Sequence, residues 1–125
     1  MAARTVEVES IEGYPVLRMN WQHRIDPKDL QPVFQQITDR LNKTKTPLYV
    51  MIDLSNDPQF PIVDTMMSAL RGPFRHPQMA EWLVFGSNRS ARMIGSLLTK
   101  ATRRENIRWF NSEEEALSHL EQIQS

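Results

Sequence analysis

The sequence predicts a single α/β domain over residues 1–125, with a mostly parallel sheet, an antiparallel N-terminal hairpin strand and four helices. Short β-rich runs alternate with longer segments whose apolar residues recur at helical spacing. The first two β-rich runs follow each other without a helix between them. Alternating strands and helices pair in parallel through right-handed helical crossovers, whereas a short turn joins an antiparallel pair. The expected order is therefore β-β-α-β-α-β-α-β-α.

The first two strands are expected to form a hairpin. Val6 and Val8 alternate with charged or polar residues, as in a half-buried edge strand, and a Glu12-Gly13 turn leads into residues 14–21. Residues 48–52 are apolar on both faces, which is typical of a central strand covered by helices on both sides. The remaining strands are expected at residues 82–85 and 106–110.

Four amphipathic helices are expected between and after these strands. The first begins at Pro27 with Asp26 as its cap, or later with Asp29 as its cap; Pro32 favours the later start, because proline fits a first helical turn. Ser112 and Glu115 have the spacing of a capping box before the last helix. The inward-facing residues are expected to be Leu30, Val33, Phe34, Ile37 and Leu41; Val63, Met66, Met67 and Leu70; Ile94, Leu97, Leu98 and Ala101; and Ala116, Leu117, Leu120 and Ile123.

Composition excludes several classes of function. Fifteen basic residues balance fifteen acidic ones, so no overall charge attracts nucleic acid or an anionic membrane. The absence of cysteine excludes disulfides, thiol nucleophiles and iron–sulfur or zinc–thiolate cofactors. The charged N-terminal segment does not fit a signal peptide, and no apolar run is long enough for stable membrane insertion. We therefore expect a cytoplasmic protein.

The order of elements, with Ile52-Asp53-Leu54-Ser55 closing the central strand, resembles the STAS domain of anti-sigma-factor antagonists. It is more similar to the SpoIIAA-like, STAS-related family, which has a strand like residues 82–86, a segment like Arg108-Trp109-Phe110 and a terminal helix like residues 114–120. The resemblance implies a bacterial, non-enzymatic regulatory or interaction module with a protein partner.

Antagonist domains of this kind carry a phosphorylatable serine in an Asp-Ser-Ser-Gly turn. The nearest match here is Asp64-Thr65-Met66-Met67, in which Met66 stands at the usual acceptor position and the glycine is missing. If the chain is phosphorylated near this turn, Thr65 or Ser55 is the expected phosphoacceptor. A phosphate there would act by repulsion from the neighbouring aspartates.

Catalytic and metal-binding residues are not indicated. His23, His76 and His119 are far apart in the sequence and have no second ligand at metal-binding spacing. Asp53, Asp57 and Asp64 cluster near the end of the central strand, where α/β sheets place ligands. Carboxylates there could hold a cation or act as acid and base, but turn formation and the first turn of a helix explain them more simply.

Two features of the third helix could bind a partner. Ser87, Asn88, Arg89 and Arg92 surround its N-terminus and could hold an anion, although Ser87 or Asn88 could simply cap the helix. Arg89, Arg92, Lys100 and Arg103 fall on one narrow arc of the same helix. This stripe is either a solvated face, paired with the acidic last helix, or an interaction surface for an acidic partner.

A small-ligand carrier is the alternative function. Methionines such as Met66, Met67 and Met93 could line an adaptable apolar cavity, or could fill irregular space in the core. The leading hypothesis is an interaction or regulatory module, and the alternative is a carrier of an apolar or anionic molecule. A homodimer is compatible with either hypothesis.

Overall fold

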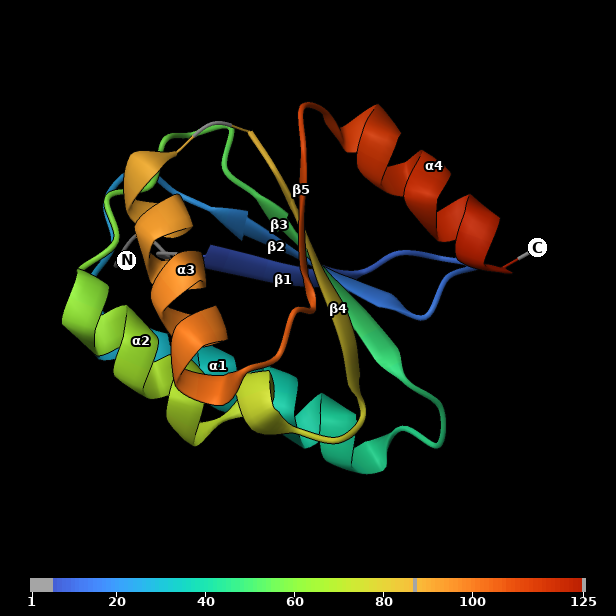
Figure 1. Ribbon diagram of the computed structural model, residues 1–125, viewed down its shortest axis with the longest axis horizontal. Coiled ribbons are helices and arrows are strands. Elements are labelled where there is room, and N and C mark those ends of the chain that lie inside the picture. The colour runs from blue at the N-terminus through green and yellow to red at the C-terminus, as the bar shows by residue number, and fades with distance from the viewer. Residues whose placement is uncertain (1–5, 87, 125) are drawn as a thin grey trace.

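The computed structural model describes residues 6–86 and 88–124. Its sheet has five strands that lie side by side in chain order (Figure 1). β1 pairs antiparallel with β2, with Val8 opposite Met19, and every other neighbouring pair is parallel. This arrangement confirms the predicted fold class. The strands are β1 (Val6–Ser10), β2 (Val16–Trp21), β3 (Leu48–Asp53), β4 (Met79–Phe85) and β5 (Ile107–Phe110).

The helices divide unequally between the two faces of the sheet. The structure contains α1 (Pro27–Lys43), α2 (Ile62–Arg71), the short 3-10 helix η1 (Pro73–Arg75), α3 (Arg89–Thr102) and α4 (Glu113–Gln124). The three crossover helices α1, α2 and α3 cover one face, and α4 lies on the other (Figure 1). The strand order never reverses, so right-handed crossovers all step the same way and place their helices on the same face.

Each face has its own hydrophobic core. The core under α1–α3 contains Trp21, Phe34 and Trp82, and the core under α4 contains Met51 and Leu83. Val50 and Met51 are adjacent in β3, point to opposite faces, and are both 0% exposed. β3 is therefore a central strand covered on both sides, as its apolar run predicted.

The start of α1 differs from the favoured prediction. The helix begins at Pro27, and the Asp26 carboxylate caps it by accepting a hydrogen bond from the backbone N–H of Lys28. Pro32 lies inside the helix instead of in its first turn. The combination of a capping aspartate and a proline at the first helical position outweighs the break in the hydrogen-bond ladder at Pro32.

The inward faces of α2 and α3 are also rotated from the prediction. In α2, Thr65 and Ala69 are buried, whereas Val63 is 72% and Met67 39% exposed. In α3 the buried residues are Ile94, Gly95 and Leu98, and both Leu97 and Ala101 are exposed. Ile94 and Leu98 face inward as predicted, and Met66 and Leu70 pack partly buried against the core, but small residues of both helices also face the sheet. Among the helices of the described segments, none is both long enough and apolar enough to cross a membrane.

The predicted capping box at α4 forms in an altered way. The backbone N–H of Glu115 donates to the Ser112 hydroxyl, as expected. The Glu115 carboxylate, however, accepts from the backbone N–H of Asn111, one residue before the expected donor. Both side chains still satisfy backbone donors at the helix start.

Candidate functional site: an apolar cavity beneath α2 and α3

An apolar cavity of about 70 Å³ lies between the sheet and the three-helix layer. Its walls come from β2, β3, β4 and β5 on one side and from α1, α2 and α3 on the other. The chain has three tryptophans, and all of them are in these walls. The aromatic lining consists of Trp21, Phe34, Phe60, Phe74, Trp82 and Trp109.

Small residues on the helices leave room for the cavity. Ala69 of α2, together with Ala91 and Gly95 of α3, faces the sheet where larger side chains would fill the space. A Cβ atom on Gly95 would lie 2.9 Å from Cζ2 of Trp109, so only glycine lets this indole ring approach α3 so closely. Ile52 of β3 also lines the cavity, which explains why it is only partly buried although β3 is central.

Three buried polar atoms in the cavity walls have no hydrogen-bond partner among the described residues. They are Nε1 of Trp21, Nε1 of Trp82 and the Thr65 hydroxyl oxygen, and all three residues are less than 5% exposed. A buried donor without a partner destabilises the folded state by about 1–3 kcal/mol. These three atoms are themselves fully buried, so the surface of the cavity is almost entirely apolar.

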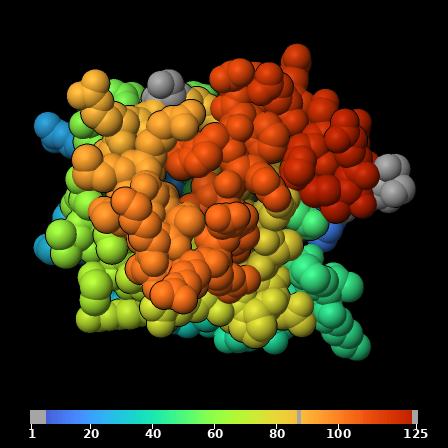
Figure 2. Space-filling model, in the orientation of Figure 1, coloured from blue at the N-terminus to red at the C-terminus, as the bar shows by residue number. Residues whose placement is uncertain are grey.

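A surface groove adjoins the cavity. The groove, about 440 Å³ in volume, lies between α3 and the β5 segment, where Figure 2 shows the surface hollowed between light-orange and red-orange atoms. Gly95, Ile107 and Trp109 line both the groove and the cavity. The guanidinium carbon of Arg92 lies 4.6 Å from the centre of the Trp109 ring, a cation–π contact at the edge of the groove.

The predicted anion loop at the start of α3 is occupied by internal hydrogen bonds. The Asn88 side chain accepts from the backbone N–H of Ala91 and from the Ser90 hydroxyl, and its amide donates to Asp57 and to the carbonyl of Pro58. Asn88 therefore caps the helix and ties the loop after β3 to it. Ser87 lies outside the described residues.

The basic residues of α3 are exposed. Arg89, Lys100 and Arg103 make no ion pair within the part of the chain that the structure describes, and the acidic helix α4 lies on the opposite face of the sheet. The suggested pairing of this stripe with α4 is therefore wrong, because the sheet separates the two helices.

Arg104, which follows the stripe in the sequence, has a structural role. Its guanidinium donates to the backbone carbonyls of Phe74, His76 and Met79.

The two predicted phosphoacceptors differ in exposure. Thr65 is buried in the cavity wall, whereas Ser55 is exposed in the loop after β3. The backbone N–H of Ser55 donates to the Asp53 carboxylate at 2.8 Å. A kinase could reach Ser55 directly but could reach Thr65 only if α2 moved.

Asp57, His23 and His76 make structural contacts in loops and turns. Asp57 has a left-handed backbone (φ 49°) and accepts from Asn88, and Asp64 is exposed in the first turn of α2. Nδ1 of His23 lies 2.8 Å from the Asp57 carbonyl, and Nε2 of His76 lies 2.7 Å from Oδ1 of Asn42. Within residues 6–86 and 88–124, no three His, Asp or Glu side chains are grouped so that they could hold a metal ion.

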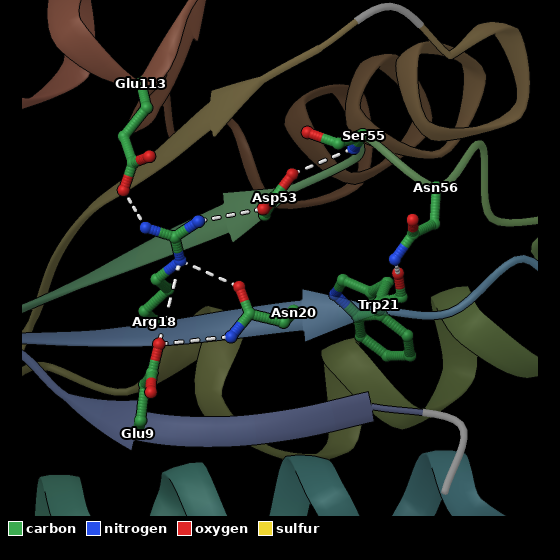
Figure 3. A network of polar contacts seen from close by, with 8 residues as sticks. All are labelled: Glu9, Arg18, Asn20, Trp21, Asp53, Ser55, Asn56 and Glu113. Carbon is green, nitrogen blue, oxygen red and sulfur yellow. Dashed lines mark hydrogen bonds and ion pairs between the residues drawn. The ribbon is translucent and has the colours of Figure 1, made fainter. Parts of the chain in front are cut away.

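A polar network on the opposite face centres on Arg18 of β2 (Figure 3). Its guanidinium donates to Asp53 at 2.9 Å and to Asn20 at 2.7 Å, and pairs with Glu113 at the start of α4. Glu9 lies 3.8 Å from the guanidinium. Burial alone would raise the pKa of Asp53, but hydrogen bonds from Ser55 and Arg18 outweigh it and hold the pKa below its usual value. The network thus joins three strands to α4.

A second polar cluster holds the other end of this face. The carboxylate of Glu81 in β4 accepts from His119 of α4 at 2.8 Å and from Arg108 of β5 at 2.7 Å. Burial tends to raise the pKa of Glu81, but these two hydrogen bonds outweigh it and lower the pKa. Sequence reasoning missed this cluster and the Arg18 network, because their members are distant in the chain and match no local motif.

The five-stranded sheet, with one antiparallel edge and four helices, is the SpoIIAA-like α/β fold. A solved structure with this fold, an uncharacterized protein of the DUF3478 family from Shewanella loihica PV-4, is similar over 96% of this chain and 98% of its own, with a TM-score of 0.59 and 16% sequence identity. At this identity the similarity shows the fold alone. No protein-family model and no curated protein sequence matched the chain.

Proposed function

We propose that this protein is a non-enzymatic regulatory or carrier module that binds a small, mainly apolar molecule in the cavity beneath α2 and α3. The observation that supports this proposal is an aromatic-walled cavity of about 70 Å³ whose surface is almost entirely apolar. An apolar group of matching size would fill this space and would be removed from water.

The arrangement of the strands supports this location. In open α/β sheets a ligand crevice forms where the strand order reverses, and this sheet has no reversal. The space between the sheet and its helices is therefore the place where the fold can enclose a ligand. Ala69, Ala91 and Gly95 on the helices leave this space open.

Tryptophan fluorescence tests the proposal, because every tryptophan lines the cavity. Titration with small uncharged probes, from ethanol to butan-1-ol, whose alkyl groups match a cavity of about 70 Å³, should give a saturable change in emission. Ala69→Leu should abolish the change by filling the cavity. Ala101→Leu, the same substitution at an exposed site on α3, is the matched control and should leave it intact. Identical titrations of wild type and Ala69→Leu would contradict the proposal.

A second candidate is an interaction surface for an acidic protein partner on α3. The observation that favours it is the stripe of exposed cations Arg89, Arg92, Lys100 and Arg103, which make no ion pair within residues 6–86 and 88–124 and which the sheet separates from the acidic α4. A labelled oligoglutamate peptide should bind wild type and lose affinity in salt, since exposed charges are screened beyond about 8–10 Å. Binding by an Arg89→Glu, Arg103→Glu variant equal to that of wild type would remove this candidate.

A further inference from the structure

The groove beside the cavity carries an excess of positive charge. Among the residues that line it, Arg92 and Lys100 are cationic and Glu105 is anionic, which leaves a net charge of +1. Arg92 contacts the π-face of Trp109 and makes no ion pair, and Lys100 likewise has no ionic partner among the described residues. The pKa of Arg108 is raised mainly by its hydrogen bond to Glu81 and by the charge of Glu81, and the negative charge of Glu105 adds a smaller effect. The groove therefore matches a single negative charge.

The groove and the cavity share a wall. Gly95, Ile107 and Trp109 line both spaces, so one molecule could contact the two together. The Trp109 ring lies against Gly95 on the helix side and beneath the Arg92 guanidinium on the groove side. This places a cationic group directly beside the entrance to an aromatic-walled space.

We infer, on the basis of the proposed ligand-binding function, that the cavity and the groove form one site for a free amphipathic carboxylate. The end of the apolar chain enters the cavity, the rest of the chain follows the shared wall into the groove, and the carboxylate lies in the groove between Arg92 and Lys100. A guanidinium can donate two parallel hydrogen bonds to a carboxylate, and an ammonium adds a point charge. Glu105 disfavours a doubly charged head group such as a phosphate monoester, because the second charge would be repelled.

Calorimetric titration with three probes of equal chain length tests the assignment: octanoate, octan-1-ol and octylammonium at neutral pH, below the concentrations at which they self-associate. Octanoate should bind about tenfold tighter than octan-1-ol because its head group makes charge-assisted hydrogen bonds. Octylammonium should bind most weakly. In Arg92→Gln, Lys100→Gln protein, octanoate should fall to the affinity of octan-1-ol, and octan-1-ol binding should be unchanged.

The matched control is Arg89→Gln, Arg103→Gln, which removes two cations from the same helix but outside the groove. This variant should keep the preference for octanoate, so a change in overall charge cannot account for the result. Glu105→Gln should strengthen octanoate binding and should also admit octyl phosphate.

Different outcomes would contradict the carboxylate assignment and the underlying proposal of a ligand-binding cavity. Equal binding of octanoate and octan-1-ol by wild type, or an equal loss of octanoate binding in both double variants, would overturn the assignment of the head group and leave the cavity proposal standing. Failure of all three probes to bind would overturn the cavity proposal itself. Circular dichroism of each variant establishes that the comparison is made between folded proteins.

Discussion

The two faces of the sheet are closed in different ways. Under α4, one helix closes a small apolar core, and two charged clusters, around Arg18 and Glu81, join the helix to the strands. Under α1–α3, three helices cover the sheet without filling the space beneath them, and polar atoms of Trp21, Trp82 and Thr65 have no partner in the described part of the chain. The difference is one of closure: ionic contacts join α4 to its face of the sheet, whereas the larger hydrophobic core under α1–α3 contains a cavity.

The largest expected effect is the loss of the Arg18 guanidinium. Arg18→Met would leave the carboxylates of Asp53, Glu113 and Glu9 near one another without their common cation. Removing one partner of a buried ionic group destabilises by about 3–5 kcal/mol, and the partial exposure of these side chains reduces the expected loss to about 2–3 kcal/mol. Urea unfolding of wild type and Arg18→Met measures this loss in the free energy of unfolding. Adding Asp53→Asn should recover part of the stability, and a further loss would contradict the network's role.

A matched pair of alanine substitutions compares packing on the two faces. Ala116→Leu inserts three carbons under α4, where Ala116 is 0% exposed, and should destabilise by about 1–3 kcal/mol through overpacking. Ala69→Leu makes the same change in the wall of the cavity and should alter the free energy of unfolding by less than about 1 kcal/mol. Equal destabilisation by the two substitutions would show that the cavity face is packed as tightly as the other.

Acid should loosen the α4 face first. The pKa values of Asp53 and Glu81 are lowered in the folded protein, so the unfolded chain takes up protons at higher pH than the folded one. Their contribution to stability is therefore complete above the usual carboxyl pKa of about 4 and is lost as the pH falls through and below it. Hydrogen exchange at pH 3 should show faster opening of α4 than of α1. An Asp53→Asn, Glu81→Gln variant should show a flatter dependence of stability on pH.

The smallest expected effect concerns the unpartnered hydroxyl of Thr65. Thr65→Val keeps the shape of the side chain and removes a buried polar atom, so it should be neutral or stabilising by up to about 1 kcal/mol. On the other face, Ser112→Ala removes an acceptor for the N–H of Glu115 and should destabilise by about 0.5–1 kcal/mol. Thermal unfolding of the two variants shows whether each substitution raises or lowers the stability of the folded protein. A loss of stability in Thr65→Val would indicate that the Thr65 hydroxyl has a partner.

The sequence predicted the layout of the chain better than the site. The alternation in β1 and the doubly apolar run of β3 were enough to place the hairpin, the central strand and the order of elements, because these depend on local patterns. The cavity depends on how α2 and α3 are rotated, which places Ala69 and Gly95 inward and leaves Val63 exposed. Apolar periodicity counts large residues, so it does not detect a space that is made by small ones.

The methionines illustrate the same limit. Met66, Met67 and Met93 were expected either to line a cavity or to fill the core, yet Met67 and Met93 are 39% and 48% exposed, and Met66 packs partly buried against the core. Arg18 gave no signal either, because its partner Asp53 lies 35 residues away along the chain and is brought near only by the parallel pairing of β2 and β3. Contacts of this kind depend on the register of the sheet, which the sequence alone does not specify.

The chain order of the strands also affects how the protein folds during its synthesis. Each strand pairs with the strand synthesised just before it, so a chain that emerges from the ribosome can extend the sheet one unit at a time, with α1, α2 and α3 covering one face as they appear. The opposite face gains its cover only when α4 has been synthesised. Until then, Val16, Met51 and Leu83 remain exposed, and the nascent chain has an apolar surface that a chaperone would recognise.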